Sequence, residues 1–99
     1  MQTEERQLKD LVSIGPAMLE DFGLLGINTV AQLRKRSPQR MYQQLCRLKG
    51  KRIDLCCFDV FVAAVAQAKD PYLPIEQRQW WYWSKVRKAR TVDHSKFVN

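Results

Sequence analysis

The stretch that decides the fold of this chain reads LVSIGPAMLEDFGLLGINTVAQL, from Leu11 to Leu33. Its start predicts a tight turn at residues 13–15 and a helix from Pro16, because the N–H that proline lacks would be unpaired at that position anyway. Four apolar residues then recur at helical spacing, namely Met18, Leu19, Phe22 and Leu25. Gly26 can adopt the left-handed conformation that ends a helix.

The segments on either side of this helix also carry helical signals. Residues 28–35 are predicted to form a short helix, with Thr29 and Gln32 as its capping box. Residues 5–12 are predicted to form the first helix of the chain, because apolar residues there recur on one side. The expected order is therefore helix, tight turn, helix, stop and helix.

The middle of the chain predicts two longer helices. Ser37 followed by Pro38 is a start signal, so a helix is expected over residues 38–48, ended by Gly50. Its expected buried residues are Met41, Tyr42, Leu45 and Leu48. The following helix, over residues 52–69, is apolar around most of its circumference and carries Phe61 on its main face. Its narrow polar side is formed by Asp54, Asp59 and Gln67.

A helix that is apolar over most of its circumference is usually central in a small helical domain. The chain is long enough for one such domain, and its apolar fraction of 45% is sufficient for one core. No strand-like alternation is evident. We therefore expect an all-α fold, a compact domain of five to six helices.

Four consecutive aromatic residues, Trp80 to Trp83, lie in a last predicted helix over residues 75–83. They cannot all face one side, because successive residues of a helix are about 100° apart. Two rings are expected to pack on the core, while Trp81 or Tyr82 remains partly exposed. From Ser84 onward the chain is polar and basic, so we expect a helical domain over residues 1–84 and a basic, flexible tail over residues 85–99.

The composition limits where the protein acts and what it holds. The N-terminus does not resemble a signal peptide, and no apolar run is long enough for a membrane helix, so a cytoplasmic protein is expected. The three cysteines, Cys46, Cys56 and Cys57, do not form a disulfide framework. His94 is the single histidine, so no metal site and no cofactor are expected. The cysteines are interpreted as buried structural thiols.

The charge of the chain is concentrated in blocks. The net charge is +7, but residues 34–52 alone carry eight basic residues and no acidic one. Residues 78–99 form a second basic block, and the remaining segments are acidic on balance. Such blocks indicate a surface that binds anions, with nucleic acid as the leading candidate, or else an ordinary solvated basic surface.

The turn before Pro16 resembles the hairpin of the helix-hairpin-helix motif, which usually reads Pro-Gly-Ile-Gly-Pro. Residues 12–16 occupy the corresponding positions, with Ser13 where the first glycine usually stands and Ala17 where a lysine is common. The resemblance implies a SAM-like helical fold. It also implies that the backbone N–H groups of Gly15 and Ala17 could hold a DNA phosphate, since free N–H groups at a helix start attract anions.

Landmarks along residues 8–85 resemble a bacterial family of helix-hairpin-helix proteins known as pathogenicity-locus proteins, and sometimes as mitomycin-resistance proteins. The residues that carry this resemblance are Ile14-Gly15-Pro16, Glu20-Asp21-Phe22, Leu24-Leu25-Gly26-Ile27, Leu45-Cys46, Asp54-Leu55-Cys56, Val60-Phe61, Asp70-Pro71 and Trp80-Trp81-Tyr82-Trp83. The first half also resembles the carboxy-terminal domain of TfoX-type competence regulators. The resemblance implies a role linked to DNA.

An enzyme is not expected. The single histidine lies in the tail, and Asp54 and Asp59 are about 500° apart around one helix, so they do not converge as an acid–base pair. The sequence has no phosphate-binding glycine loop of the P-loop type. Catalytic residues are therefore predicted to be absent.

Two non-enzymatic functions fit the sequence. The first is DNA binding without sequence specificity, mainly through phosphates, with Trp81 or Tyr82 available to stack on unpaired bases. The predicted phosphate contacts are Gly15, Ala17, Arg34, Lys35, Arg36, Arg40, Arg47, Lys49, Lys51 and Arg52. The second is a protein-interaction or adaptor domain that uses the aromatic helix as its contact surface. The sequence leaves the oligomeric state open.

Overall fold

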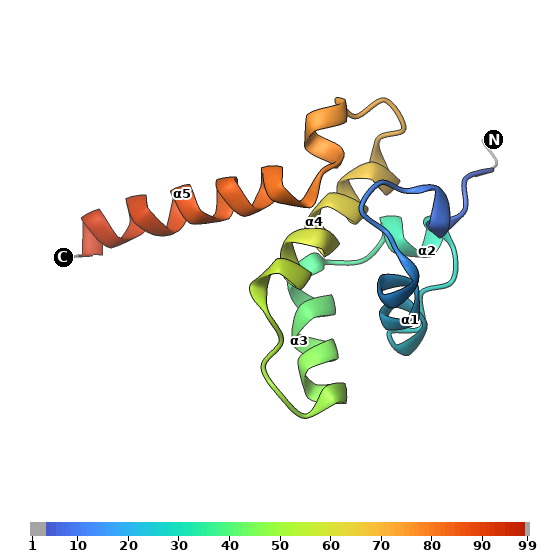
Figure 1. Cartoon of the computed structure of the whole chain (residues 1–99), viewed down its shortest axis with the longest axis horizontal. Coiled ribbons are helices and arrows are strands. Elements are labelled where there is room, and N and C mark those ends of the chain that lie inside the picture. The colour runs from blue at the N-terminus through green and yellow to red at the C-terminus, as the bar shows by residue number, and fades with distance from the viewer. Residues whose placement is uncertain (1–3, 99) are drawn as a thin grey trace.

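A computed structural model describes residues 4–98 of the chain, with the backbone alone for residues 91–98. Every regular element in this range is a helix, so the all-α prediction is confirmed (Figure 1). The elements are the 3-10 turn η1 (Leu8–Asp10), α1 (Pro16–Leu24), α2 (Val30–Arg34), α3 (Pro38–Lys49), α4 (Leu55–Lys69), the 3-10 turn η2 (Ile75–Arg78) and α5 (Trp80–Val98).

Helix α4 lies at the centre of the fold, as its apolar circumference predicts. It packs against α2, α3, α5 and η2, and Figure 1 shows these elements arranged around it. Phe61 of α4 is fully buried and stacks on Phe22 of α1 with ring centroids 5.8 Å apart. The other large side chains of this core are Ile27, Val30, Leu33, Met41 and Leu45.

The start and stop signals of the sequence are confirmed at most helix ends. Thr29 Oγ1 accepts from the Gln32 N–H, and the Gln32 side chain bonds back to the cap, as a capping box requires. Ser37 Oγ accepts from the Arg40 N–H at the start of α3. Gly26 and Gly50 both have positive φ, +76° and +67°, the left-handed conformation that glycine adopts without strain.

The helix expected over residues 5–12 is wrong. Only the single 3-10 turn η1 forms there, and residues 4–7 are irregular. The Arg6 guanidinium explains the difference, since its Nη1 donates to the carbonyl oxygen of Gln67 at 2.8 Å and its Nη2 to that of Ala68 at 3.3 Å. The segment is therefore held against the end of α4. The helix-hairpin-helix motif stays a prediction, because the element before its turn is not an α-helix.

Asp54, Asp59 and Gln67 were expected to form a polar side of α4, and this prediction is wrong for two of them. Asp59 and Gln67 are buried, at 0% and 4% exposure. Asp54 is exposed, and it caps the helix by accepting from the Cys56 N–H at 2.9 Å, so α4 starts after Asp54 rather than at residue 52. Buried polar groups need partners, and both buried residues have them.

Arg87 of α5 is the partner of Asp59. Its Nε and Nη2 donate to the two carboxylate oxygens of Asp59 at 2.9 and 3.0 Å. This bidentate pair fixes α5 on α4. Figure 1 shows that beyond this contact the helix projects away from the rest of the fold.

The last helix differs from its predicted bounds. It does not run over residues 75–83: a separate 3-10 turn occupies Ile75–Arg78, and α5 continues as a helix to Val98. The sequence beyond Ser84 lacks an apolar stripe, which is why periodicity did not reveal this helix. The division into residues 1–84 and a flexible tail over residues 85–99 stays a prediction.

Leu48, expected in the core, is 55% exposed. It lies in the last turn of α3, and Figure 1 shows that this end of α3 extends past α4. Leu45, one turn earlier, is fully buried. The periodicity is therefore right, but the core ends one turn before the helix does.

Candidate nucleic-acid interface

Four exposed basic side chains surround helix α3, and they are here termed the α3 cations: Lys35, Arg40, Arg47 and Lys51. Arg40 and Arg47 are seven residues apart, so they lie within about 20° of each other on α3 and about 10 Å apart along its axis. Lys35 and Lys51 flank the two ends of the helix. Over residues 4–90, none of these four side chains takes part in an ion pair or hydrogen bond.

Arg34 and Arg36 were predicted to contact phosphate, but both are engaged within the fold. Arg34 donates to Glu4 Oε1 at 2.8 Å and to the carbonyl oxygen of Ala68 at 3.2 Å. Arg36 donates to the carbonyl oxygen of Leu25 at 3.1 Å, just after α1. These contacts satisfy carbonyl groups at helix ends, where intrahelical partners are missing. The two side chains therefore stabilise the fold.

Two further residues of the basic block also have partners. Lys49 Nζ lies 2.9 Å from Asp21 Oδ1, and the hydrogen bond to this carboxylate raises the pKa of Lys49. Arg52 lies beside the Tyr42 hydroxyl, which donates to the carbonyl oxygen of Ile53. Burial raises the pKa of Tyr42, and the neighbouring Arg52 charge opposes that rise. The eight basic residues that were predicted to contact phosphate thus fall into two groups. Four have partners within the fold, and the other four are the α3 cations.

The turn before α1 has the conformation that its sequence pattern suggested. Ser13 has a φ of +71°, a left-handed value that is uncommon for residues other than glycine, at the position where the related motif has a glycine. Gly15 and Ala17 are both exposed, and a Cβ at Gly15 would meet nothing within 4 Å. Ala17 lies in the first turn of α1, where N–H groups have no intrahelical partner and attract anions.

Ser13 also joins this turn to the last helix. Its Oγ accepts a hydrogen bond from the N–H of Trp80 at 3.4 Å. A residue 67 positions earlier in the chain therefore binds the first N–H of α5. Trp80 is 38% exposed, which the sequence did not indicate. The aromatic segment and the turn before α1 are therefore neighbours on the surface.

The two aromatic residues predicted to be available for stacking differ in their surroundings. Trp81 is 42% exposed, and the Lys85 ammonium lies 5.2 Å from the centre of its ring. Tyr82 is half-buried and packs edge-on against Trp83, with centroids 5.1 Å apart. Trp83 in turn donates from Nε1 to the carbonyl oxygen of Gln77 at 2.7 Å. Trp81 is therefore the better placed of the two for an external contact.

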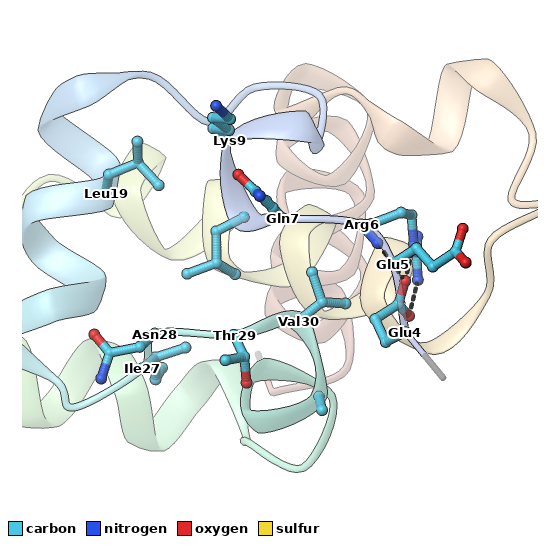
Figure 2. Close-up of a pocket in the computed structure, with 12 residues that line it drawn as sticks. Glu4, Glu5, Arg6, Gln7, Lys9, Leu19, Ile27, Asn28, Thr29 and Val30 are labelled. Carbon is cyan, nitrogen blue, oxygen red and sulfur yellow. Dashed lines mark hydrogen bonds and ion pairs between the residues drawn. The ribbon is translucent and has the colours of Figure 1, made fainter. Parts of the chain in front are cut away.

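A hollow of about 790 Å³ lies between residues 4–9 and the 27–31 segment (Figure 2). Its floor includes the apolar side chains of Leu19, Ile27 and Val30. At one end Glu4 receives hydrogen bonds from the Arg6 side chain, which lower the pKa of Glu4 to about 2. No sequence pattern indicates this hollow, because its two walls are about 20 residues apart along the chain.

The cysteines lie on α3 and α4 and are less buried than predicted. Cys56 is exposed, and its hydrogen bond to Asp54 raises the pKa of the thiol. Cys57 is half-buried, and burial raises its pKa to about 11. Cys46 Sγ accepts from the Ile53 N–H at 3.5 Å. Among the described residues no group of three metal-binding side chains gathers, and the absence of a bound metal stays a prediction.

The described part of the chain has no helix that combines the length and the apolarity needed to cross a membrane.

Comparison with known proteins gives two matches. The model of the Cdd1 family, described as "Pathogenicity locus", matches residues 1–89. A relative from Streptomyces lavendulae, "Mitomycin resistance protein McrB", is 35% identical over 81 residues, which is 82% of this chain and 73% of the relative. No solved structure matches the chain.

Proposed function

This chain belongs to the pathogenicity locus family, and we propose that it is a non-enzymatic cytoplasmic module that binds DNA through its phosphates without reading base sequence. The observation that carries this proposal is the set of four α3 cations, which are exposed and have no acidic partner within residues 4–90. The names of the relatives state no ligand, so the proposal rests on this surface.

The α3 cations are suited to a polyanion because phosphates of a nucleic-acid strand are spaced along a line. Arg40 and Arg47 offer two guanidinium groups on one side of a rigid helix, and Arg side chains can bind phosphate in a bidentate manner. Binding would release the counterions condensed on DNA, which supplies most of the free energy of contacts that do not depend on sequence.

The turn before α1 is proposed as a second phosphate contact. Gly15 and Ala17 are exposed, and the left-handed Ser13 gives this turn the shape that a glycine would give it. On this proposal the turn and α1 act as the helix-hairpin-helix motif, with the fold resembling SAM-like domains and the TfoX carboxy-terminal domain. Glu20 is exposed nearby, so we expect the turn to contribute less affinity than the α3 cations.

The proposal is tested by titrating the protein into fluorescent DNA duplexes of unrelated sequence at low salt. The double variant Arg40→Ala/Arg47→Ala should weaken binding to all duplexes by the same factor, since only phosphate contacts are lost. The matched control is Lys9→Ala/Lys69→Ala, which removes the same charge from exposed side chains away from α3. Equal losses in both variants would leave only a general charge attraction and would contradict the proposal.

A protein-interaction or adaptor domain is the alternative. It is favoured by exposed apolar side chains near η2 and at the start of α5. Tyr72 is 89% and Ile75 71% exposed, and Trp80 and Trp81 are 38% and 42% exposed. Exposed aromatic residues are typical of contact surfaces between proteins. A folded sample that binds no DNA at low salt would put this alternative first.

A further inference from the structure

One face of α5 carries an aromatic ring and two basic side chains in line, here termed the α5 stripe: Trp81, Lys85 and Lys88. They are spaced by four and then three residues, so they lie within about 60° of one another around the helix. All three are exposed. The stripe therefore presents an indole and two ammonium groups to the solvent along about 10 Å of a rigid helix.

Other side chains in the same turns of α5 face the rest of the fold. Ser84 is buried at 5% exposure, and Arg87 forms its bidentate pair with Asp59 of α4. These contacts fix the rotation of α5 about its axis. The exposed parts of Trp81, Lys85 and Lys88 therefore keep one orientation relative to α4.

The positive charge of residues 80–90 favours an anionic ligand. Residues 80–90 contain four basic residues and no acidic one. Lys85 is already placed over the ring of Trp81, at 5.2 Å from its centre, which leaves the other face of the indole for a flat ligand. A suitable partner is thus anionic and carries exposed rings. Single-stranded DNA has both properties, because unpaired bases are free to stack and phosphates lie beside them.

We propose that the α5 stripe binds unpaired bases of DNA, with Trp81 stacking on a base and Lys85 and Lys88 contacting the adjacent phosphates. This inference rests on the proposed function and gives it a substrate class. The α3 cations would hold duplex and the α5 stripe single strand, and both helices pack on α4 (Figure 1). The preferred ligand is then a duplex with a single-stranded tail.

The experiment compares a blunt duplex, an oligothymidylate of about 15 nucleotides and a duplex with a thymidylate tail, each titrated into the full chain. Trp81→Ala should weaken binding to the oligothymidylate by about tenfold or more, since stacking on one aromatic ring contributes that much per base. It should change binding to the blunt duplex less than about twofold. The control Tyr72→Ala removes a more exposed aromatic side chain outside the stripe.

A charge variant tests the lysines separately. Lys88→Gln should reduce the dependence of oligothymidylate affinity on salt by about 0.7 in the slope of log affinity against log salt, the value for one phosphate on a single strand. Circular dichroism of each variant, with the helical signal of the wild type, establishes that the loss is not unfolding.

Several results would overturn the inference. One is a Trp81→Ala variant that binds oligothymidylate as the wild type does, or that loses the same factor on the blunt duplex. Another is a wild-type protein that ignores oligothymidylate but binds vesicles with about a third of anionic lipid, which would assign the stripe to a membrane surface. Failure of the proposed function is distinct, because blunt-duplex binding would then be insensitive to Arg40→Ala/Arg47→Ala.

Discussion

The side-chain amide of Gln67 forms two hydrogen bonds with the backbone of Val12. Together they resemble the pair of bonds between two residues of neighbouring β-strands. The Val12 N–H donates to Gln67 Oε1 at 2.9 Å, and Gln67 Nε2 donates to the carbonyl oxygen of Val12 at 3.0 Å. The same Nε2 lies 3.4 Å from the carbonyl oxygen of Arg78. One buried amide of α4 therefore holds both the segment before the turn at Ser13 and the end of η2.

Replacing Gln67 by Leu should destabilise the fold by about 2–4 kcal/mol. The backbone N–H and carbonyl of Val12 would lose their partners, and each unsatisfied buried group costs about 1–3 kcal/mol. Urea denaturation gives the free energy of unfolding. The control Gln43→Leu makes the same change on an exposed face of α3 and should cost less than about 0.5 kcal/mol. Equal effects of the two substitutions would contradict the role assigned to Gln67.

Arg87→Leu should cost about 3–5 kcal/mol, because it leaves the buried carboxylate of Asp59 without its charged partner. The double variant Asp59→Leu/Arg87→Leu should recover most of that loss, since it buries no charge. A double-mutant cycle from chemical denaturation measures the coupling. Strictly additive losses would show that the pair does not hold α5 on α4.

The pKa of Glu4, lowered from 4.5 to about 2 by its hydrogen bonds with Arg6, makes stability depend on pH. A carboxyl whose folded-state pKa is lowered stabilises the fold above its unfolded pKa and loses that effect as pH falls toward the folded value. The wild type should therefore exceed Glu4→Gln in stability at pH 7, and the difference should shrink from about pH 4.5 toward pH 2. Denaturation midpoints across this range check it, with Glu5→Gln as the exposed control; a constant difference would contradict it.

The thiols of Cys56 and Cys57 should react slowly with iodoacetamide near neutral pH. The thiolate is the reactive form, and the pKa of Cys57 is raised to about 11, while that of Cys56 is also raised. Cys56 is exposed and should be modified before Cys57. Peptide mass spectrometry after timed alkylation orders the sites, and metal analysis of the same sample should find no stoichiometric zinc. Modification of Cys57 at the rate of a free cysteine would contradict this account.

Local signals in the sequence predicted the parts of the fold that are locally determined. Pro16 and the cap at Ser37 give helix starts, and the glycines at 26 and 50 give stops, because each depends on the conformation of one or two residues. The central position of α4 also followed from its composition. These signals needed no knowledge of which segments come together.

The wrong predictions concern residues whose partners are distant in the sequence. Residues 5–12 have helical periodicity, but Arg6 binds carbonyl groups more than 60 residues away, and this contact holds the segment in an irregular form. Gln67 and Asp59 look like surface residues until their partners, Val12 and Arg87, are known. For the candidate site, composition found the basic block but could not show that Arg34 and Arg36 are used inside the fold, nor that Trp80 is exposed.

The central claim, phosphate binding by the α3 cations, is tested most directly by the salt dependence of affinity for duplex DNA. Four phosphates engaged by Lys35, Arg40, Arg47 and Lys51 predict a slope of log affinity against log salt of about −3.6, since each contact contributes about −0.9. Arg40→Ala/Arg47→Ala should reduce the slope to about −1.8, whereas Lys9→Ala/Lys69→Ala should leave it near the wild-type value. An unchanged slope in the α3 variant, or no duplex binding by the folded wild type, would contradict the account.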